Sequence, residues 1–176
     1  HQSFDVHGMT LALEIFTNRI VMTNPGAPLI DTNRFIDLPP KSRNDKMAQA
    51  MFLFNLCEKR GSGMDRAVAG IEAMRLPAIT VERGEDFTRA RLFPLKKYTE
   101  MTRGEKVQAC YQHACLLYEN GFELTNQSLR ERLGMPKNNS AGASRIIADA
   151  VDAGLIHLSD KAPDSKKYSS YVPYYV

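Results

Sequence analysis

The sequence of 176 residues predicts an α+β fold with two domains, residues 1–98 and residues 99–176. In the first part, short runs of alternating apolar and polar residues end at Gly, Pro or Asn, which is typical of strands, and two helical patterns separate them. The second part carries three helical patterns with recognisable start and stop residues, followed by short apolar runs. Residues 94–101 are charged and show no periodicity, so we expect the domain joint there.

Composition is that of an ordinary globular chain. Hydrophobic residues make up 43% of the sequence and charged residues 24%, and no apolar run approaches the length that spans a membrane. No charged-then-apolar leader precedes His1, so we expect a cytoplasmic protein with no membrane partner. The three cysteines show no CxxC spacing and the four histidines are scattered, which argues against a disulfide framework and a zinc site.

The net charge of +3 is unevenly distributed. Residues 1–98 hold 14 Lys and Arg against 11 Asp and Glu, whereas residues 99–176 hold nine of each. The second part is therefore neutral overall, and any binding to a polyanion must depend on where its cations lie.

The first domain begins with a strand pair. Residues 9–16 alternate between apolar and polar side chains, and residues 19–23 resume the pattern after a tight connection. The Asn-Pro-Gly run at residues 24–26 ends the second strand, because Pro lacks a backbone donor and Gly permits a reversal. We expect an irregular segment over residues 27–42.

Two helices and a hairpin complete the first domain. Asn44 is the expected cap of the first helix, whose apolar stripe comprises Met47, Ala50, Met51, Phe54 and Cys57. The second helix ends before Pro77, and its stripe comprises Met64, Ala67, Val68, Ile71 and Met74. We expect the methionines of both stripes to belong to an adaptable core. Residues 79–83 and 87–93 predict a hairpin.

The second domain opens with two capped helices. Thr102 and Glu105 form a Thr-x-x-Glu capping box, and Asn120 and Gly121 end the first helix. Its expected buried face comprises Val107, Cys110, Tyr111, Ala114, Leu117 and Tyr118. The second helix is expected to be capped by Thr125, with a hydrophobic staple of Leu124 and Leu129, and to be closed by Gly134 and Pro136.

The third helix and two strands follow. The helix is expected to begin near Asn139 or Ser140, to end at Gly154, and to bury Ala143, Ile146, Ile147, Ala150 and Val151. Residues 155–158 and 168–172 predict two strands around a Lys-rich tip, and we expect the tyrosines near the C-terminus to pack against the third helix. This order of elements is that of a winged helix-turn-helix, which usually lays one helix into a DNA major groove.

Polar residues at the start of the third helix are the candidate DNA contacts. Amide, hydroxyl and guanidinium groups hydrogen-bond to base edges and phosphates, and recognition helices enter the groove by their N-terminal end. The candidates are Lys137, Asn138, Asn139, Ser140, Ser144 and Arg145, with Lys161, Lys166 and Lys167 placed to contact the DNA backbone from the wing. The alternative is that these residues form the solvated face of a protein-interaction module.

A second set of polar residues could bind a nucleotide. A Gly-x-Gly run enters the second helix of the first domain, where free backbone N–H groups and the helix dipole favour an anion. The candidates are Asn24, Gly26, Arg43, Asn44, Glu58, Gly61 and Gly63. The equally weighted alternative is that Gly61 simply ends one helix before the next begins.

The strand hairpin, Asn-Pro-Gly, Arg-Asn and Glu-x-x-Gly-x-Gly motifs, followed by a helix, resemble a family of bacterial and archaeal regulators. These are labelled RecG-related ATP-dependent helicases or Schlafen/AlbA-type transcriptional regulators. The resemblance covers nearly all of the chain. It implies an AlbA-like domain, then a segment like the ATP-binding fold of gyrase, chaperone and histidine-kinase ATPases (GHKL), then a helix-turn-helix.

The chain departs from that family pattern in two places. Residues 1–4 match the end of a His-Arg-Asp-Tyr-like stretch, so we expect a truncated GHKL-ATPase-like domain without the helix whose Asn would hold magnesium. Residues 24–26 stand where members of the ATPase superfamily place an Asp for adenine. ATP and magnesium are therefore expected, if at all, as cofactors of the full-length protein, and no enzymatic activity is expected of this chain.

The sequence thus predicts a transcriptional regulator that binds double-stranded DNA through its C-terminal domain, with the first domain sensing a nucleotide or forming dimers. A homodimer would suit two half-sites one helical turn apart. The alternatives are an ATP-binding or ATP-hydrolysing enzyme of the GHKL type, and a protein-interaction module. Helicase activity has no support, since the chain has no GxxxxGK(S/T) loop.

Overall fold

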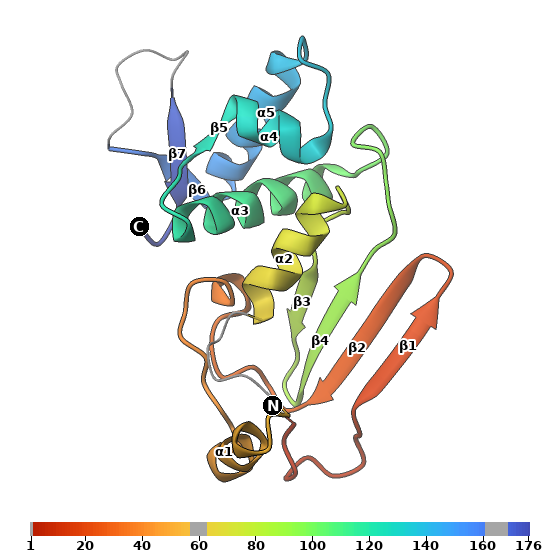
Figure 1. The fold of residues 1–176 in the computed structure, drawn as a ribbon. Helices are drawn as coiled ribbons and strands as arrows, with labels where there is room; N and C mark the ends of the chain where they lie inside the picture. The colour runs from red at the N-terminus through yellow and green to blue at the C-terminus, as the bar shows by residue number, and fades with distance from the viewer. Residues whose placement is uncertain (1, 57–62, 161–168) are drawn as a thin grey trace. The chain divides into compact units, whose positions relative to one another are not determined.

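The computed structural model describes residues 2–56, 63–160 and 169–176 of the chain. Within these residues strands and helices follow one another in a mixed α+β order (Figure 1). None of the described helices is long and apolar enough to cross a membrane.

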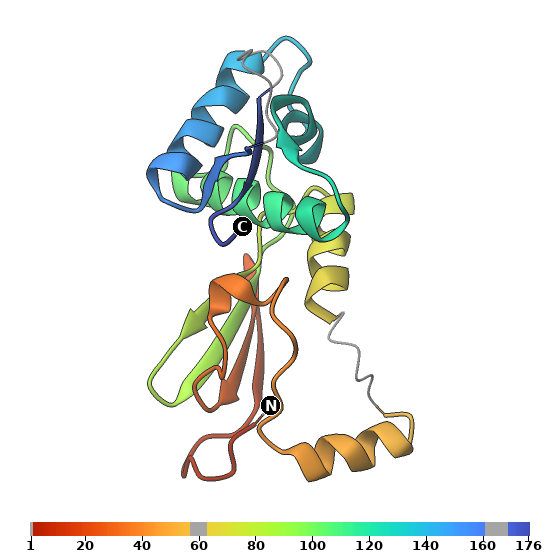
Figure 2. The ribbon, with the colours of Figure 1, turned by 90° about the vertical axis from the view of Figure 1, so that its left-hand side faces the viewer.

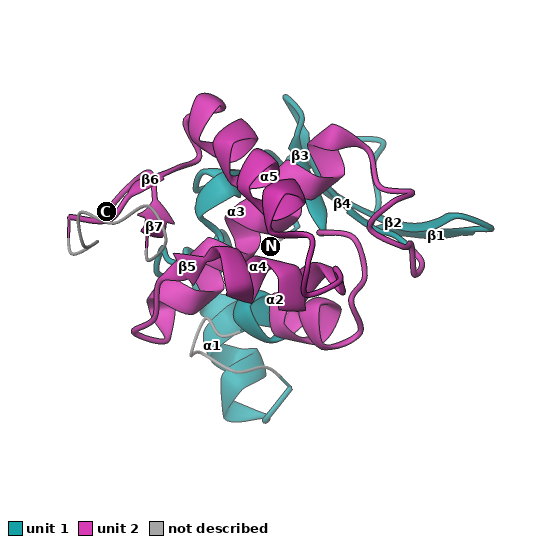
Figure 3. Ribbon diagram, turned by 90° about the horizontal axis from the view of Figure 1, so that it is seen from above, with its two compact units in different colours: residues 1–66, 79–93 teal, residues 67–78, 94–176 magenta. Residues whose placement is uncertain are grey.

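The chain forms two compact units (Figure 3). Unit 1 comprises residues 1–66 and 79–93, and unit 2 comprises residues 67–78 and 94–176. The expected division into domains at residues 98 and 99 stays a prediction.

Unit 1 contains a four-stranded antiparallel sheet with the order β1-β2-β4-β3. Its strands are β1 (Ala12–Phe16), β2 (Arg19–Pro25), β3 (Thr80–Arg83) and β4 (Phe87–Leu92). Both hairpins are predicted correctly, because each joins neighbours in sequence through a short turn. The two hairpins join through β2 and β4, where Thr23 pairs with Arg89 and Val21 with Arg91.

The two faces of this sheet differ sharply in polarity. On one face, Leu13 pairs with Met22 and Ile15 with Ile20, and these side chains are exposed. On the other face, polar and charged side chains contact one another across neighbouring strands. Arg89 Nε donates to the Thr23 hydroxyl at 3.1 Å, and Arg91 forms an ion pair with Glu82 on β3.

The segment between β2 and the next α-helix lies beside the sheet (Figure 2). It contains the short 3-10 helix η1 (Thr32–Arg34), which packs next to β3. The helix α1 (Asp45–Leu53) follows, and none of its residues is buried. Met47 is 48% exposed and Met51 39% exposed, so the prediction that they belong to a core is wrong. An apolar stripe predicts a buried face only where another element packs against it.

Unit 2 is built around the long helix α3 (Arg103–Glu119), which is buried on all sides from Ala109 to Cys115. The helices α4 (Asn126–Leu133) and α5 (Ser140–Asp152) lie against it. Three short strands, β5 (Leu124–Thr125), β6 (Ile156–Leu158) and β7 (Ser170–Pro173), form an antiparallel sheet with the order β5-β7-β6. Residues of α2 (Gly63–Ala73) from Ala67 onward also belong to unit 2, and Val68 and Ile71 are its buried residues.

The helix boundaries of unit 2 follow the predicted caps. The Thr102–Glu105 capping box is present, and the Thr125 hydroxyl accepts from the Ser128 amide. Gly134 ends α4 with a φ of 62°, a left-handed conformation that glycine adopts without steric cost. Asn139 caps α5 through the Gly142 amide.

Several core predictions need correction. Val151 of α5 and Tyr118 of α3 are each 38% exposed, and Met74, just after α2, is 60% exposed. The ring of Tyr174 stacks on Tyr111 of α3, with ring centroids 6.1 Å apart, a contact that the sequence did not predict. The helix α3 can accept this ring because it lies at the centre of the unit and is buried from Ala109 to Cys115.

Candidate functional site

The helix α5 presents a polar face made of small residues. Ala143, Ile146, Ile147 and Ala150 are buried on its other side, as predicted. The exposed residues among its first nine are Ser140, Ala141, Ser144, Arg145 and Ala148. Arg145 is the only long side chain among these exposed residues. A cation on a face of short side chains can approach another macromolecule closely.

Two residues of α4 tie α5 and the preceding turn in place. Asn126 Nδ2 donates to the Ser140 carbonyl and to the Ser144 hydroxyl, both at 2.9 Å. Arg130 Nε donates to Asn126 Oδ1 at 2.9 Å, and its Nη1 donates to the Lys137 carbonyl at 2.8 Å. This network of side chains fixes the turn between the two helices, and sequence reasoning missed it.

Asn139 has a structural role in this arrangement. Its Oδ1 accepts from the Gly142 amide at 3.1 Å, and its Nδ2 donates to the Tyr98 hydroxyl at 3.1 Å. Both ends of the amide are therefore engaged within the protein. Lys137 and Asn138, which precede it, are exposed and stay candidate contacts. Lys161, Lys166 and Lys167 lie outside the described residues.

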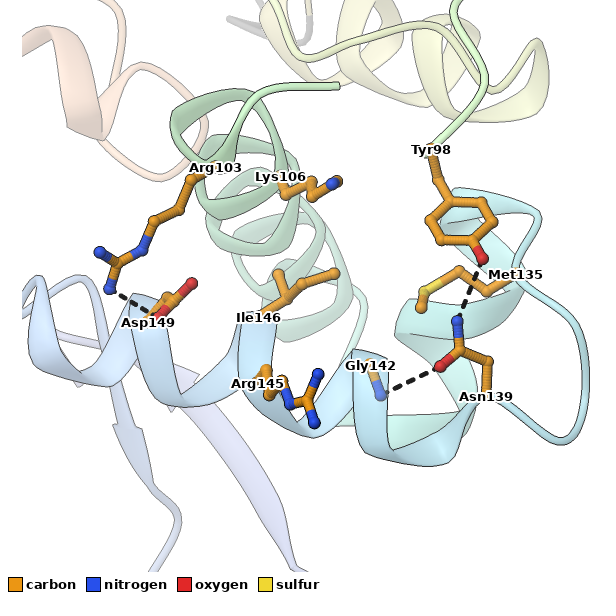
Figure 4. Close-up of a pocket in the computed structure, with 9 residues that line it drawn as sticks. All are labelled: Tyr98, Arg103, Lys106, Met135, Asn139, Gly142, Arg145, Ile146 and Asp149. Carbon is orange, nitrogen blue, oxygen red and sulfur yellow. Dashed lines mark hydrogen bonds and ion pairs between the residues drawn. The ribbon is translucent and has the colours of Figure 1, made fainter. Parts of the chain in front are cut away.

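A shallow pocket of about 250 Å³ lies between α3 and α5 (Figure 4). Arg103 and Lys106 come from the first turn of α3, and Arg145 comes from α5. Ile146 and the ring of Tyr98 provide apolar lining. The pocket therefore combines cationic groups from two helices with an apolar wall.

One carboxylate lines this pocket. Arg103 Nη2 donates to Asp149 Oδ1 at 2.7 Å, and this bond holds the pKa of Asp149 below its ordinary value. Within the described residues, no hydrogen bond or ion pair joins Lys106 or Arg145 to a carboxylate. The lining is net positive, since Arg103 and Asp149 compensate each other.

Unit 2 also holds a buried ionic cluster that the sequence did not indicate. Glu72 Oε2 lies 2.9 Å from His113 Nδ1, and Glu72 Oε1 lies 3.3 Å from Arg132 Nε. Arg132 also donates to the Leu76 carbonyl at 2.9 Å, and its side chain is only 2% exposed. Burial lowers the pKa of Arg132, and the Glu72 carboxylate acts in the opposite direction. The cluster joins α2 to α3 and α4 inside the unit, so its role is in packing.

Three of the candidate nucleotide-binding residues lie together in unit 1. Arg43 donates from its Nη2 to the Ala27 carbonyl, and Asn44 Nδ2 donates to the Gln2 carbonyl at 2.8 Å. Gly26 has a φ of 102°, and a Cβ there would lie 2.9 Å from the Ser3 Cβ. Asn44 stands at the N-cap position of α1 but makes no side-chain cap hydrogen bond, and its amide nitrogen donates to the Gln2 carbonyl.

The other candidate nucleotide-binding residues are not joined to Gly26, Arg43 or Asn44 by any described contact. Asn24 is half-buried in β2, where it pairs with Thr88 of β4. Gly63 is the first residue of α2, and a Cβ there would meet no atom within 4 Å. Glu58 and Gly61 lie outside the described residues. No atom of the described residues therefore requires glycine at residue 63 on steric grounds.

Residues 8–92 match the family model described as "Putative ATP-dependent DNA helicase recG C-terminal". The match covers just under half of the chain and includes all four strands of the unit 1 sheet. This segment is therefore similar to an ATPase-like domain of RecG-related proteins. No curated protein and no solved structure matches the chain.

Proposed function

We propose that unit 2 is a winged helix-turn-helix that binds duplex DNA for transcriptional control. In this proposal α4 and α5 are the helix-turn-helix, α5 is the recognition helix, and β6 and β7 are the wing strands. The order of three helices followed by a strand pair supports it, as does the short strand β5, which completes the sheet.

The exposed face of α5 is the observation that carries this proposal. Ser140, Ser144 and Arg145 are exposed there, and no acidic residue precedes Asp149 on the helix. A hydroxyl or a guanidinium can hydrogen-bond to base edges, and the short neighbours let the backbone approach the groove. Ser144 accepts its bond from Asn126, so its own proton remains available to donate to a base or a phosphate.

A gel-shift assay against pooled random duplexes tests the proposal. We expect wild-type protein to bind with an affinity that falls as salt rises, and Arg145→Ala to weaken binding about tenfold or more. Lys46→Gln is the matched control, because Lys46 is an exposed cation on α1 in the other unit. Equal affinity of Arg145→Ala and wild type would show that Arg145 does not contact the DNA. A lack of salt-dependent binding by wild type would favour a protein-interaction module.

Nucleotide binding by unit 1 is a second candidate function, and the family match over residues 8–92 favours it. Under this proposal unit 1 senses ATP, with magnesium, or mediates dimer formation for the DNA-binding unit. A ligand that binds the folded state at 100 times its Kd stabilises it by about 2.7 kcal/mol, which a thermal melt detects.

The variant Gly63→Ala tests whether a nucleotide binds at the start of α2. A methyl group at residue 63 would meet no atom of the described residues within 4 Å, so we expect the variant to fold like wild type. If magnesium-ATP raises the melting temperature of wild type and not of Gly63→Ala, the phosphates lie near the start of α2. The absence of any shift in wild type would set nucleotide binding aside.

A further inference from the structure

The first turn of α3 carries two cations, Arg103 and Lys106, at the positive end of the helix dipole. Cations at this position are unfavourable for the helix, since the backbone N–H groups already give it a partial positive charge. Arg103 is compensated by Asp149 at 2.7 Å. Lys106 has no such partner among the described residues, so no ion pair offsets the unfavourable charge at this position.

The pocket beside Lys106 has the chemistry of an anion site. Arg145 supplies a second uncompensated cation from α5, on the other side of Ile146 in Figure 4. The Tyr98 hydroxyl accepts from Asn139, which leaves its own proton available to donate. Ile146, only 7% exposed, keeps one wall apolar, which strengthens electrostatic attraction to a bound charge.

We propose that this pocket binds a phosphate group through Lys106 and Arg145. Phosphate oxygens can accept hydrogen bonds from two cations and a hydroxyl at once, because they point in different directions. If α5 enters a major groove, the group is a backbone phosphate flanking that groove, and this choice of source rests on the proposed DNA binding. A free phosphorylated small molecule would use the same contacts.

The salt dependence of DNA affinity tests the first source. Each phosphate contact contributes about 0.9 to the slope of log K against log salt. We expect Lys106→Gln to lower the slope by about that amount and to weaken binding about five- to tenfold for every duplex sequence. Lys106→Arg keeps the charge and should keep the slope. Lys46→Gln, which removes an exposed cation from unit 1, should also keep it.

Inorganic phosphate tests the second source without DNA. We compare melting temperatures in phosphate and in chloride of equal ionic strength, for wild type, Lys106→Gln and Arg145→Gln. If the DNA slope is unchanged in Lys106→Gln but phosphate stabilises wild type and neither variant, the site takes a free phosphate.

The salt dependence of DNA binding and the melting comparison in phosphate also distinguish failure of the phosphate site from failure of the proposed DNA binding. An unchanged slope in Lys106→Gln, together with equal melting behaviour of wild type and both variants in phosphate, would overturn the phosphate site. If wild type binds no duplex even at low salt, the proposed DNA binding fails, and the melting comparison alone decides whether the pocket binds phosphate.

Discussion

Arg132 Nε lies 3.3 Å from the Glu72 carboxylate, and both side chains are largely withdrawn from solvent. His113 lies on the same carboxylate, at 2.9 Å from its second oxygen. A buried charge is costly without a partner, so each member of this cluster depends on the others.

Removing Glu72 should therefore destabilise unit 2 strongly. We expect Glu72→Ala to lower the free energy of unfolding by about 3–5 kcal/mol, because Arg132 would stay buried without a counter-charge. The double variant Glu72→Met with Arg132→Met should recover much of this loss. Urea denaturation measures both changes. The control is Glu131→Ala on the exposed side of α4, with an expected change within about 0.5 kcal/mol. A similar effect of Glu131→Ala would contradict the special role of the cluster.

The carboxylate of Glu105 should make stability depend on acid pH. Burial acts to raise its pKa, but hydrogen bonds from Lys96 at 2.7 Å and from the Thr102 amide at 2.7 Å outweigh burial and lower it from 4.5. The stabilisation is thus fully present above pH 4.5 and is lost as the pH falls through the lowered value.

The variant Glu105→Gln tests this pH dependence, since Gln keeps the shape of the capping box and loses the charge. We expect it to be less stable than wild type at neutral pH, with the difference shrinking in acid. Glu85→Gln removes the same charge from an exposed turn in unit 1 as a control. A stability difference for Glu105→Gln that is constant from pH 7 to pH 3 would argue against the assignment.

The thiols of α3 should be unreactive in the folded protein. Burial raises the pKa of Cys110 to about 12, and Cys115 is buried in the same helix. The thiolate is the reactive form, so alkylation at neutral pH should be very slow. In a Cys57→Ser background, we expect a thiol reagent to label neither residue until denaturant is added. Rapid labelling of two thiols under native conditions would contradict the buried core.

If unit 2 binds duplex DNA as proposed, loss of Asn126 should weaken that binding by disturbing the position of α5. Asn126→Ala would free the Ser140 carbonyl and the Ser144 hydroxyl, and Arg130 would lose one of its partners. We expect affinity for duplex DNA to fall about five- to tenfold, because α5 would no longer be held in place before binding.

The matched control for Asn126→Ala is Gln127→Ala. Gln127 is the next amide on α4 and bonds to Glu131 at 2.9 Å, with no bond to α5 among the described contacts. Gel shifts compare the two variants, and thermal melts check that both fold. Equal affinities would show that the Asn126 network does not position α5 for the proposed DNA binding.

The sequence alone predicted most elements of both units. The capping box at Thr102, the Thr125 cap and the end of α4 at Gly134 were predicted correctly, because each depends on groups within one helical turn. The exposed polar face of α5 followed from the same local periodicity, so Arg145 was identified as exposed. Local patterns also set the strands, since alternation and turn residues act over a few positions.

The tertiary structure decided which distant groups meet. Lys106 and Arg145 line one pocket although they belong to different helices, and Asn126 reaches Ser144 across the turn. Asn44 was expected to cap α1 and instead holds the Gln2 carbonyl, a partner that only the path of the chain supplies. The methionines of α1 have helical spacing and yet are exposed, because burial depends on a packing partner that periodicity does not specify. Sequence fixes the local preferences of each segment, whereas the contacts between segments follow from the free energy of packing the whole unit.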